Sequence, residues 1–462
     1  MSLTKVTHSM ITASFVYADD YIPPDVDPAT EDCDVYIQEA ITDALGKILK
    51  FTDGKSYQLG ATLDLTGLRG MFGACYFYWN GPLNGVMFDA SMNSGIVISG
   101  GIGEMIVRAD TPVRAEIAFK MGGTVGFTTF QSSMHNISLV GATRSDLSNP
   151  TIAIDGGPTA AYSLNDGEFH HIRIDGFDVG YRFCAPDQKI WGGTCRIEYA
   201  DPNSFGAAIS LANNGRVQAH GWVVSEAKTP IRCTHGVWGA AFYGCWFEGI
   251  TSSMASVAPA GSEIYEGLSF YNCLFSTNSP AAYLFDLQEW QPSAVGIANQ
   301  GQLRLIGCVV SPVSNNSNIR LHSNSSYNPL SVQIYGMQNA VPGEALTFSG
   351  LTSQVFWQEN GSLKIGSVTG GIARHLTNAA QLTFPSIAGG SRDSATISVP
   401  GVRVTSDSAS VVATPVDGII QNGLVWFAYV SANDTVTVAI QNTTGGALTP
   451  TVLTWRVDVF TH

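Results

Sequence analysis

The sequence predicts an all-β protein: a right-handed parallel β-helix, or solenoid, followed by a C-terminal antiparallel β-sandwich, with one short helix near the N-terminus. Three observations predict this fold. Short apolar or alternating runs separated by Gly, Asn, Ser and Pro fill most of the chain, as is typical of β structure. One apolar position recurs about every 23–35 residues, which indicates stacked repeats. A chain of 462 residues is also too long for one ordinary core unless the fold grows in one dimension.

The expected helix is the segment "DVYIQEAITDALGKIL", Asp34 to Leu49. It carries apolar residues at helical spacing after an acidic start. No later segment gives a comparable helical signal, because the following runs are short and are interrupted by turn residues.

The repeat is visible in a series of short runs such as "MHNISLVG", "YGCWFEGI" and "YNCLFSTN". Aligned by eye, these runs share one apolar position, occupied in turn by Ile137, Ile172, Cys195, Trp222, Cys245, Cys273, Cys308 and Met337. Each step holds two or three short strands, so it corresponds to one coil that buries its apolar face only against its neighbours. The alternative is a β-sandwich with irregular strand spacing, which leaves the recurrence unexplained.

The pattern of the sequence changes between residues 342 and 367, where the repeated apolar position stops. Beyond it, "SATISVPGVRV", "GLVWFAYVSANDTVTVAIQNTTGG" and "TVLTWRVDVF" are alternating strands joined by Asn-Asp and Gly-Gly turns, which predict an antiparallel sandwich. We therefore expect four parts: an N-terminal segment (1–33), the β-helix (34–345), a linker (346–367) and the sandwich (368–462).

Composition excludes several functions. The net charge of −14 and the lack of Lys/Arg runs argue against nucleic acid and anionic membrane surfaces as partners. No apolar window is long enough to span a membrane, and the N-terminus lacks a secretory pattern, so we expect folding in a cytoplasm. The eight cysteines form no CxxC pair or zinc-type cluster, so we expect buried, reduced thiols, and neither a metal nor another cofactor.

Candidate catalytic residues lie three positions beyond the shared apolar residue, where each strand runs into its turn. Four central coils place a carboxylate at or next to this point: Asp175, Glu198, Glu226 and Glu248. Stacking separates carboxylates on neighbouring coils by about 5 Å and those two coils apart by about 10 Å. Glycoside hydrolases use two carboxyl groups about 5 Å apart, or about 6.5–9.5 Å apart when a water lies between them.

Candidate substrate-binding residues accompany these acids. The outward position after the apolar column holds Arg173, Arg196 and Trp246, which suit a sugar carboxylate and a sugar ring face. His171, Arg232 and Tyr243 are further candidates. The competing interpretation is that these are ordinary strand-end acids and exposed ion pairs, worth under about 1 kcal/mol each. The sequence leaves both interpretations open.

Three segments resemble bacteriophage tailspikes and capsular polysaccharide depolymerases with a pectate-lyase-like β-helix. They are the opening "MSLTKVTHSMI", the helix-then-strand entry from Asp34 to Leu65, and the C-terminal "FPSIAGGSRDSATISVPGV" with the strands that follow it. The entry departs from the family pattern, because the usual "P-x-G-x-Y" reads "TDGKSYQL". The resemblance implies that the helix caps the open N-terminal end of the solenoid. It also implies a homotrimer in the virion, assembled in the host cytoplasm, which joins other tail proteins through its N-terminus.

The resemblance further implies that the protein binds, and usually cuts, a capsule, exopolysaccharide or O-antigen of the bacterial host. Hydrolysis by paired carboxylates is the favoured reaction. One alternative is a lyase acting on a uronic acid, with His170, His171 or a tyrosine as base and Arg173 or Arg196 on the sugar carboxylate. The other is a receptor-binding fibre without catalytic activity.

Overall fold

The structure is a computed structural model. It describes residues 15–123, 128–143, 149–157, 163–197, 206–234, 236–257, 262–277, 283–287, 290–291, 302–311, 318–321, 330–339, 347–349, 352–359, 362–366, 374–404 and 409–461. The chain divides into two compact units, Met1–Asn328 with Gln338–Gly350, and Pro329–Met337 with Leu351–His462. Each unit is described by itself.

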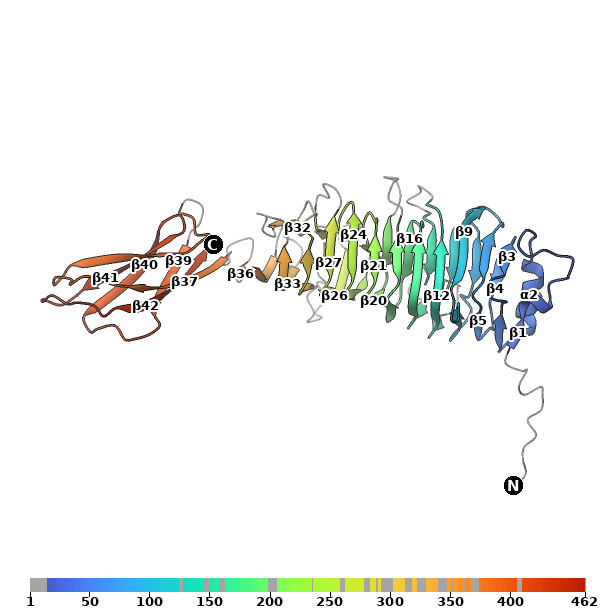
Figure 1. The fold of residues 1–462 in the computed structure, drawn as a ribbon, viewed down its shortest axis with the longest axis horizontal. Coiled ribbons are helices and arrows are strands. Elements are labelled where there is room, and N and C mark those ends of the chain that lie inside the picture. Colours follow the sequence, from blue (N-terminus) through green and yellow to red (C-terminus); the bar gives the residue numbers. More distant parts are fainter. Residues whose placement is uncertain are drawn as a thin grey trace, which may run out of the picture. The chain divides into compact units, whose positions relative to one another are not determined.

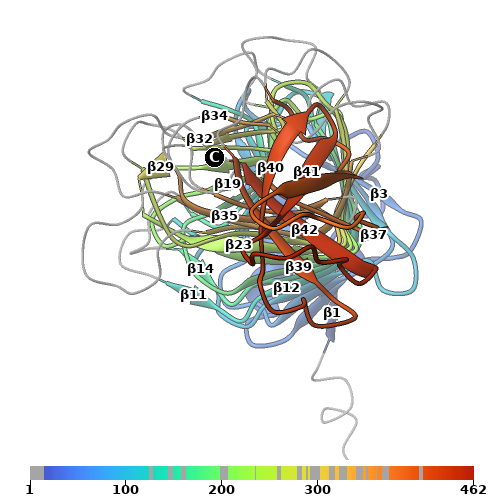
Figure 2. The same cartoon turned by 90° about the vertical axis from the view of Figure 1, so that its left-hand side faces the viewer.

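The first unit is a right-handed parallel β-helix, as the sequence predicts, and its strands stack side by side along the solenoid (Figure 1). Seen end-on, successive coils superimpose (Figure 2). The first sheet of this unit contains β1 (Phe15–Tyr17), β2 (Ile48–Lys50), β3 (Ser56–Leu59), β5 (Gly70–Phe72), β6 (Tyr76–Trp79), β8 (Val97–Ser99), β9 (Met105–Pro112), β12 (Ser133–Val140), β15 (Glu168–Asp175), β17 (Gln188–Trp191), β18 (Thr194–Arg196), β20 (Arg216–His220), β21 (Val223–Ser225), β23 (Val237–Tyr243), β24 (Trp246–Ile250), β26 (Ser262–Tyr271), β27 (Leu274–Thr277), β29 (Trp290–Gln291), β30 (Gln302–Ile306) and β31 (Val309–Val310).

The second sheet of the solenoid is also parallel. In spatial order it contains β4 (Leu63–Asp64), β7 (Val86–Asp89), β10 (Ile117–Lys120), β13 (Ile152–Asp155), β16 (Val179–Phe183), β19 (Ala207–Leu211), β22 (Ile231–Cys233), β25 (Ala255–Val257), β28 (Phe285–Leu287), β32 (Asn318–Leu321) and β34 (Thr347–Ser349). A small parallel pair, β11 (Thr129–Phe130) with β14 (Leu164–Asn165), completes the described strands of the unit. The strands begin ahead of the expected boundary at residue 34, because β1 pairs with β2.

The N-terminal helix is shorter than the sequence predicts. After the 3-10 turn η1 (Ala18–Asp20), α2 spans Asp34–Asp43 and buries Ile37, Ala40 and Ile41. It ends there because Gly46 turns the chain in the left-handed conformation and the following residues join β2. The amide of Gln38 exchanges two hydrogen bonds with the backbone of Asp64, at 2.9 and 3.0 Å. These bonds provide partners for backbone groups of the edge strand β4, and the helix covers that edge of the sheet.

The register of the first sheet differs from the predicted alignment of the coils at Cys195. Cys195 pairs with Ile174 and Val224, not with Ile172 and Trp222, so it belongs to the inward column two residues further along the strand. The cause is the corner before β18, where two glycines follow each other. A Cβ on Gly193 would lie 2.2 Å from the carbonyl oxygen of Ile172, so this place excludes any larger residue. The shift is even, and Cys195 therefore remains buried.

A bend recurs in the coils of the first sheet, and it separates two strands in most of them, whereas β12 and β15 run through it. Residues with positive φ lie at this bend: Gly101, Asn136, His171, Gly192 with Gly193, Gly221, Gly244, Asn272 and Gly307. Gly244 of "FYGCWFEG" and Asn272 of "FYNCLFST" occupy the same structural place, and Cys245 and Cys273 follow them into the core. All eight cysteines are buried and unpaired, which confirms the expectation of structural thiols.

The second unit contains two antiparallel sheets, confirming the predicted change of architecture. One contains β38 (Arg392–Ser398), β41 (Thr435–Asn442) and β40 (Leu424–Ala432), and the other joins β37 (Arg374–Leu382), β42 (Leu453–Thr461) and β39 (Ala409–Pro415). Their common core includes Val436, Val438, Trp455 and Val457. Strands β33 (Leu330–Asn339), β35 (Thr352–Glu359) and β36 (Ser362–Gly366) lie ahead of these sheets, the last two within the range expected as linker.

Candidate functional site

Three of the acids predicted from the sequence, Asp175, Glu226 and Glu248, lie near or just beyond the ends of stacked strands, and Arg196 lies on the strand between those of Asp175 and Glu226. Asp175 pairs with Arg196, Arg196 with Ser225, and Ser225 with Glu248. Because the register shifts by two at Cys195, the neighbour of Asp175 is Arg196 and not Glu198. Glu198 itself lies outside the described residues.

Arg196 links two of the carboxylates. Its Nε donates a hydrogen bond to Glu226 Oε2 at 2.7 Å, and its Nη1 lies 3.9 Å from Asp175 Oδ1. The Glu226 amide donates to the carbonyl oxygen of Glu248 at 3.0 Å, so these two acids belong to adjoining coils. We call Asp175, Arg196, Glu226 and Glu248 the acid–arginine cluster. The side chains of its three ion-paired members are between 31% and 56% exposed, so a polymer can reach them.

Backbone conformation sets the position of Glu226. It follows β21 with a φ of 54°, in the left-handed region that few non-glycine residues adopt. The strand therefore ends in a turn at this residue, and the Glu226 side chain meets Arg196 from the neighbouring coil. Such strained positions occur more often at functional sites than elsewhere in proteins.

Trp246 lies beside the acid–arginine cluster on the same outward face. It precedes Glu248 by two residues on β24, and side chains two apart in a strand share a face. Trp246 is 46% exposed, its partners in register are Val223 and Leu274, and no described aromatic ring stacks on it. A flat, open ring next to carboxylates provides a surface for the apolar face of a sugar. Arg173 lies on this side too, two residues before Asp175 on β15.

Tyr243 has a different environment from Trp246. It belongs to an outward column of stacked rings formed by His135, His170, Trp191, His220, Tyr243 and Tyr271. The ring of Tyr243 lies 4.6 Å from that of His220 and 4.8 Å from that of Tyr271, centroid to centroid. Both faces of Tyr243 are therefore covered, and only its edge and hydroxyl remain for a ligand.

His171 and Arg232 are the remaining sequence candidates. His171 is exposed at the bend of its coil with a φ of 52°, whereas its neighbour His170 stacks in the ring column and lies 3.6 Å from Glu168. Arg232 is on β22 in the second sheet, paired in register with Ser210 and Ser256. The structure therefore places Arg232 on a different sheet from the acid–arginine cluster.

A second site was missed by the sequence reasoning. A hollow of about 150 Å³ lies on the outward face of the first sheet, before the bend, and we call it the glycine hollow. Small residues form its floor: Gly239, Ala241, Gly267 and Ser269. Its larger lining residues are Arg216, Gln218, Tyr243, Glu266, Tyr271 and Arg304. Glycines inside strands are a sequence signal for such a feature, because they permit close backbone approach and leave space above it.

A β-bulge shapes the glycine hollow. Val237 pairs with Ile264 and Gly239 with Gly267, so β26 carries one extra residue in this interval, which includes Glu266. Glu266 thereby reaches Arg216 at 3.2 Å, although Gly239 separates their coils. A Cβ on Gly239 would lie 2.7 Å from the Gly267 carbonyl oxygen, which explains why the floor carries no side chain there.

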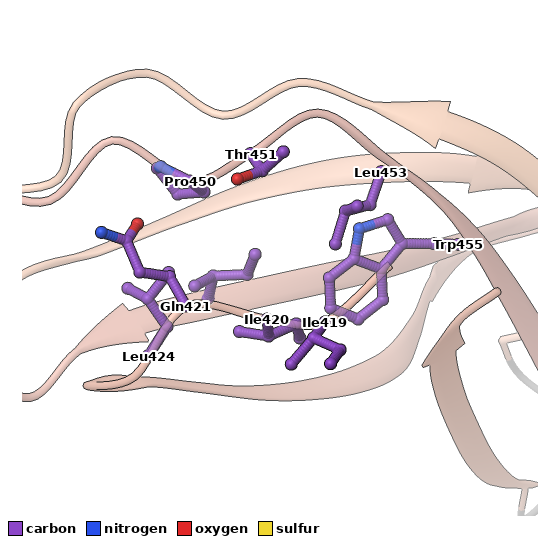
Figure 3. A pocket seen from close by; sticks show the side chains of 9 residues that line it. Ile419, Ile420, Gln421, Leu424, Pro450, Thr451, Leu453 and Trp455 are labelled. Carbon is purple, nitrogen blue, oxygen red and sulfur yellow. The ribbon is translucent and has the colours of Figure 1, made fainter. Parts of the chain in front are cut away.

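A hollow in the second unit is much smaller. It is lined mainly by apolar residues, including Ile419, Leu424, Leu453 and Trp455, and Figure 3 shows these side chains around it. Its volume of about 10 Å³ holds no more than about one water molecule, so it is no ligand site.

Two further features are absent from the described part of the chain. No group of three or more His, Cys, Asp or Glu residues there is arranged to hold a metal ion. Nor does any helix in the described ranges have the length and apolar character needed to cross a membrane.

Comparison with known proteins finds no matching family model and no matching curated protein. Similar solved structures include a double mutant of the tailspike protein of E. coli bacteriophage HK620, with 10% identity and a TM-score of 0.43, covering 97% of this chain and 94% of that chain. The tailspike protein of Pseudomonas phage LKA1 has 10% identity and a TM-score of 0.39, over 90% of this chain and 67% of that chain. An endo-xylogalacturonan hydrolase from Aspergillus tubingensis has 12% identity and a TM-score of 0.32, covering 75% of this chain and 100% of that chain. The structural neighbours are thus mostly phage tailspikes, with a polysaccharide hydrolase among them.

Proposed function

We propose that this protein is a bacteriophage tailspike that binds a bacterial surface polysaccharide and shortens it by glycoside hydrolysis. The observation that carries the proposal is the acid–arginine cluster, in which Arg196 contacts the carboxylates of Asp175 and Glu226 while Glu248 and Trp246 lie on the adjoining coil. The cluster supplies the residue types that hydrolysis of a glycan requires, on one accessible face.

In the proposed reaction, one carboxylic acid protonates the glycosidic oxygen as the bond to the anomeric carbon breaks. A second carboxylate either activates a water or attacks that carbon itself. Glu226 and Glu248 are on adjoining coils, about 5 Å apart before side-chain reach, which suits direct attack. Asp175 and Glu226 are two coils apart, about 10 Å before side-chain reach, and Arg196 lies between them, so Glu226 and Glu248 are the preferred pair.

The experiment is amide substitution of each acid: Asp175→Asn, Glu198→Gln, Glu226→Gln and Glu248→Gln. Purified protein is incubated with capsule and O-antigen preparations from a panel of host strains, and product mass and ultraviolet absorbance are measured. We expect at least two variants to fold normally yet lose cleavage by 100-fold or more. Full activity in all four variants would overturn the assignment of the site.

The same measurement separates the two alternatives. A lyase gives an unsaturated product that absorbs in the ultraviolet, whereas hydrolysis gives none. A receptor-binding fibre gives tight glycan binding with no shortening of the polymer. The fibre alternative is favoured by one specific observation: Arg196 already occupies the space between Asp175 and Glu226.

We also propose that the protein is a homotrimer within the virion. Support comes from β40, an edge strand on which Val425, Phe427 and Tyr429 share one face and are each between 44% and 47% exposed. Apolar residues on a sheet edge favour association with another chain. Replacing Phe427 with Glu is expected to convert the native mass from three chains to one. A wild-type mass of one chain by light scattering would contradict the proposal.

A further inference from the structure

The glycine hollow contains an arginine that the fold leaves without a carboxylate. Arg304, on β30, donates a hydrogen bond to the neutral side chain of Gln302, and no described carboxylate lies within ion-pairing distance of it. The other arginine, Arg216, already contacts Glu266 at 3.2 Å and Asp187 at 3.6 Å. Arg304 therefore offers its remaining donors to a ligand in the hollow.

The charge of the glycine hollow differs from that of the whole chain. Its lining carries two arginines and one glutamate, in a protein whose net charge is −14. Because Glu266 and Asp187 already contact Arg216, Arg304 is the lining cation that attracts an anion, and a guanidinium matches a carboxylate through two parallel hydrogen bonds. The hollow therefore favours a ligand with one carboxylate.

The remaining lining suits a polyhydroxylated ligand. Gln218 and Glu266 offer side-chain oxygens, and the stacked rings of Tyr243 and Tyr271 present their edges. The volume of about 150 Å³ is below the roughly 300–1,000 Å³ of pockets for drug-sized molecules, so it matches one sugar unit.

We propose that the glycine hollow binds one carboxylate-bearing sugar unit of a polysaccharide, with Arg304 on its carboxylate. The substrate class would then be an acidic glycan, an inference that rests on the proposed function for its connection to a polymer. Ala241 and Ser269 lie in register between Gln218 and Arg304, and their small side chains leave the space that the sugar ring fills.

Binding of single sugars tests the proposal. The full chain is titrated with glucuronate, galacturonate and N-acetylneuraminate, and in parallel with glucose, galactose and inorganic phosphate, using ligand-detected NMR. We expect at least one acidic sugar to bind with a millimolar Kd, and the neutral sugars and phosphate to bind at least tenfold more weakly. Failure of all three acidic sugars, or equal binding of a neutral sugar or of phosphate, would overturn it.

Two variants locate the binding. Arg304→Gln removes the charge, and Ala241→Gln fills the hollow with the side chain that Gln218 already carries one coil earlier. Each is expected to weaken acidic-sugar binding at least tenfold. Arg69→Gln, at an exposed arginine near the N-terminal end of the solenoid, is the matched control and is expected to change nothing. Unchanged binding in both hollow variants would contradict the site.

The proposed function fails independently of this inference. Glu226→Gln is expected to abolish polymer cleavage while leaving acidic-sugar binding intact. If the wild type cleaves no polymer but binds an acidic sugar through Arg304, the hydrolase proposal is wrong and the sugar site stands. If the wild type cleaves a neutral polymer and binds no acidic sugar, the hydrolase proposal stands and the sugar site is wrong.

Discussion

Arg196 Nε lies 2.7 Å from Glu226 Oε2, and this bond joins two neighbouring coils of the solenoid. The guanidinium also faces Asp175, so it neutralises and orients carboxylates that would otherwise repel one another. In the proposed reaction Arg196 is a positioning residue, because it acts through Glu226.

Replacing Arg196 with Ala is expected to lower kcat about tenfold, equivalent to about 1.4 kcal/mol of activation free energy. Because the ion pairs are exposed, unfolding free energy should change by under about 1 kcal/mol. Kinetics with purified polysaccharide measure the first quantity and denaturant titration the second. Arg196→Lys retains the charge and should recover part of the loss in kcat. An Ala variant with wild-type kcat would show that the ion pair is only structural.

Trp246→Ala is expected to raise KM for the polymer about tenfold with a smaller effect on kcat, because the open ring contacts the sugar and not the reacting bond. Trp246→Phe, the matched control, keeps an aromatic face and should retain most of the affinity. Equal KM values for all three proteins would exclude Trp246 from the binding surface.

Arg182 and Asp155 form a partly buried ion pair on the second sheet, in which the side chain of Asp155 is only 3% exposed. The arginine Nε donates to Asp155 Oδ1 at 2.8 Å. Arg182→Gln leaves a buried carboxylate without its cation and is expected to cost roughly 3 kcal/mol of unfolding free energy. The double variant with Asp155→Asn should recover at least half of that loss. Additive losses in denaturant titration would show that the pair is not coupled.

The lowered pKa of Asp19 predicts that the stability of the folded protein depends on pH. Burial acts to raise the pKa of Asp19, but hydrogen bonds from Lys55, Thr52 and Tyr57 outweigh it and lower the pKa below its ordinary value. The folded protein thus favours the ionised form. Its stabilisation is fully present above the unfolded pKa, near 3.9, and is lost as pH falls through the lower folded pKa.

The comparison that isolates this effect uses Asp19→Asn. The difference in Tm between wild type and variant is expected to be largest at pH 6 and to shrink as the pH falls from about 4 to 2. A difference in Tm that stays constant over this range would contradict the lowered pKa.

The inward columns of the solenoid could be predicted from the sequence because alternation in a strand has a period of two. A register error of two residues at Cys195 left every inward residue buried, so the error was invisible in the pattern of apolar residues. The helix could be predicted because its apolar residues recur at helical spacing, although its end could not. Whether Ile48 continues a helix or enters β2 depends on the strands that it pairs with.

The candidate site could be predicted only in part. The sequence brought Asp175, Glu226 and Glu248 to one edge of the sheet, and the register keeps them on that edge. The position of Arg196 between Asp175 and Glu226 could not be predicted, because the register of Arg196 depends on the consecutive glycines Gly192 and Gly193. The glycine hollow was missed because its charged lining residues come from coils whose outward positions show no shared pattern.

The sequence by itself determined the class of fold and which residues face the core, since hydrophobic burial repeats with each coil and leaves a periodic trace. The tertiary structure alone decided which charged side chains meet. Contacts between coils depend on the register, and the register is fixed by close backbone approaches at Gly193, Gly239 and Gly267. A single missing Cβ leaves no periodic signal, yet it sets which guanidinium lies beside which carboxylate.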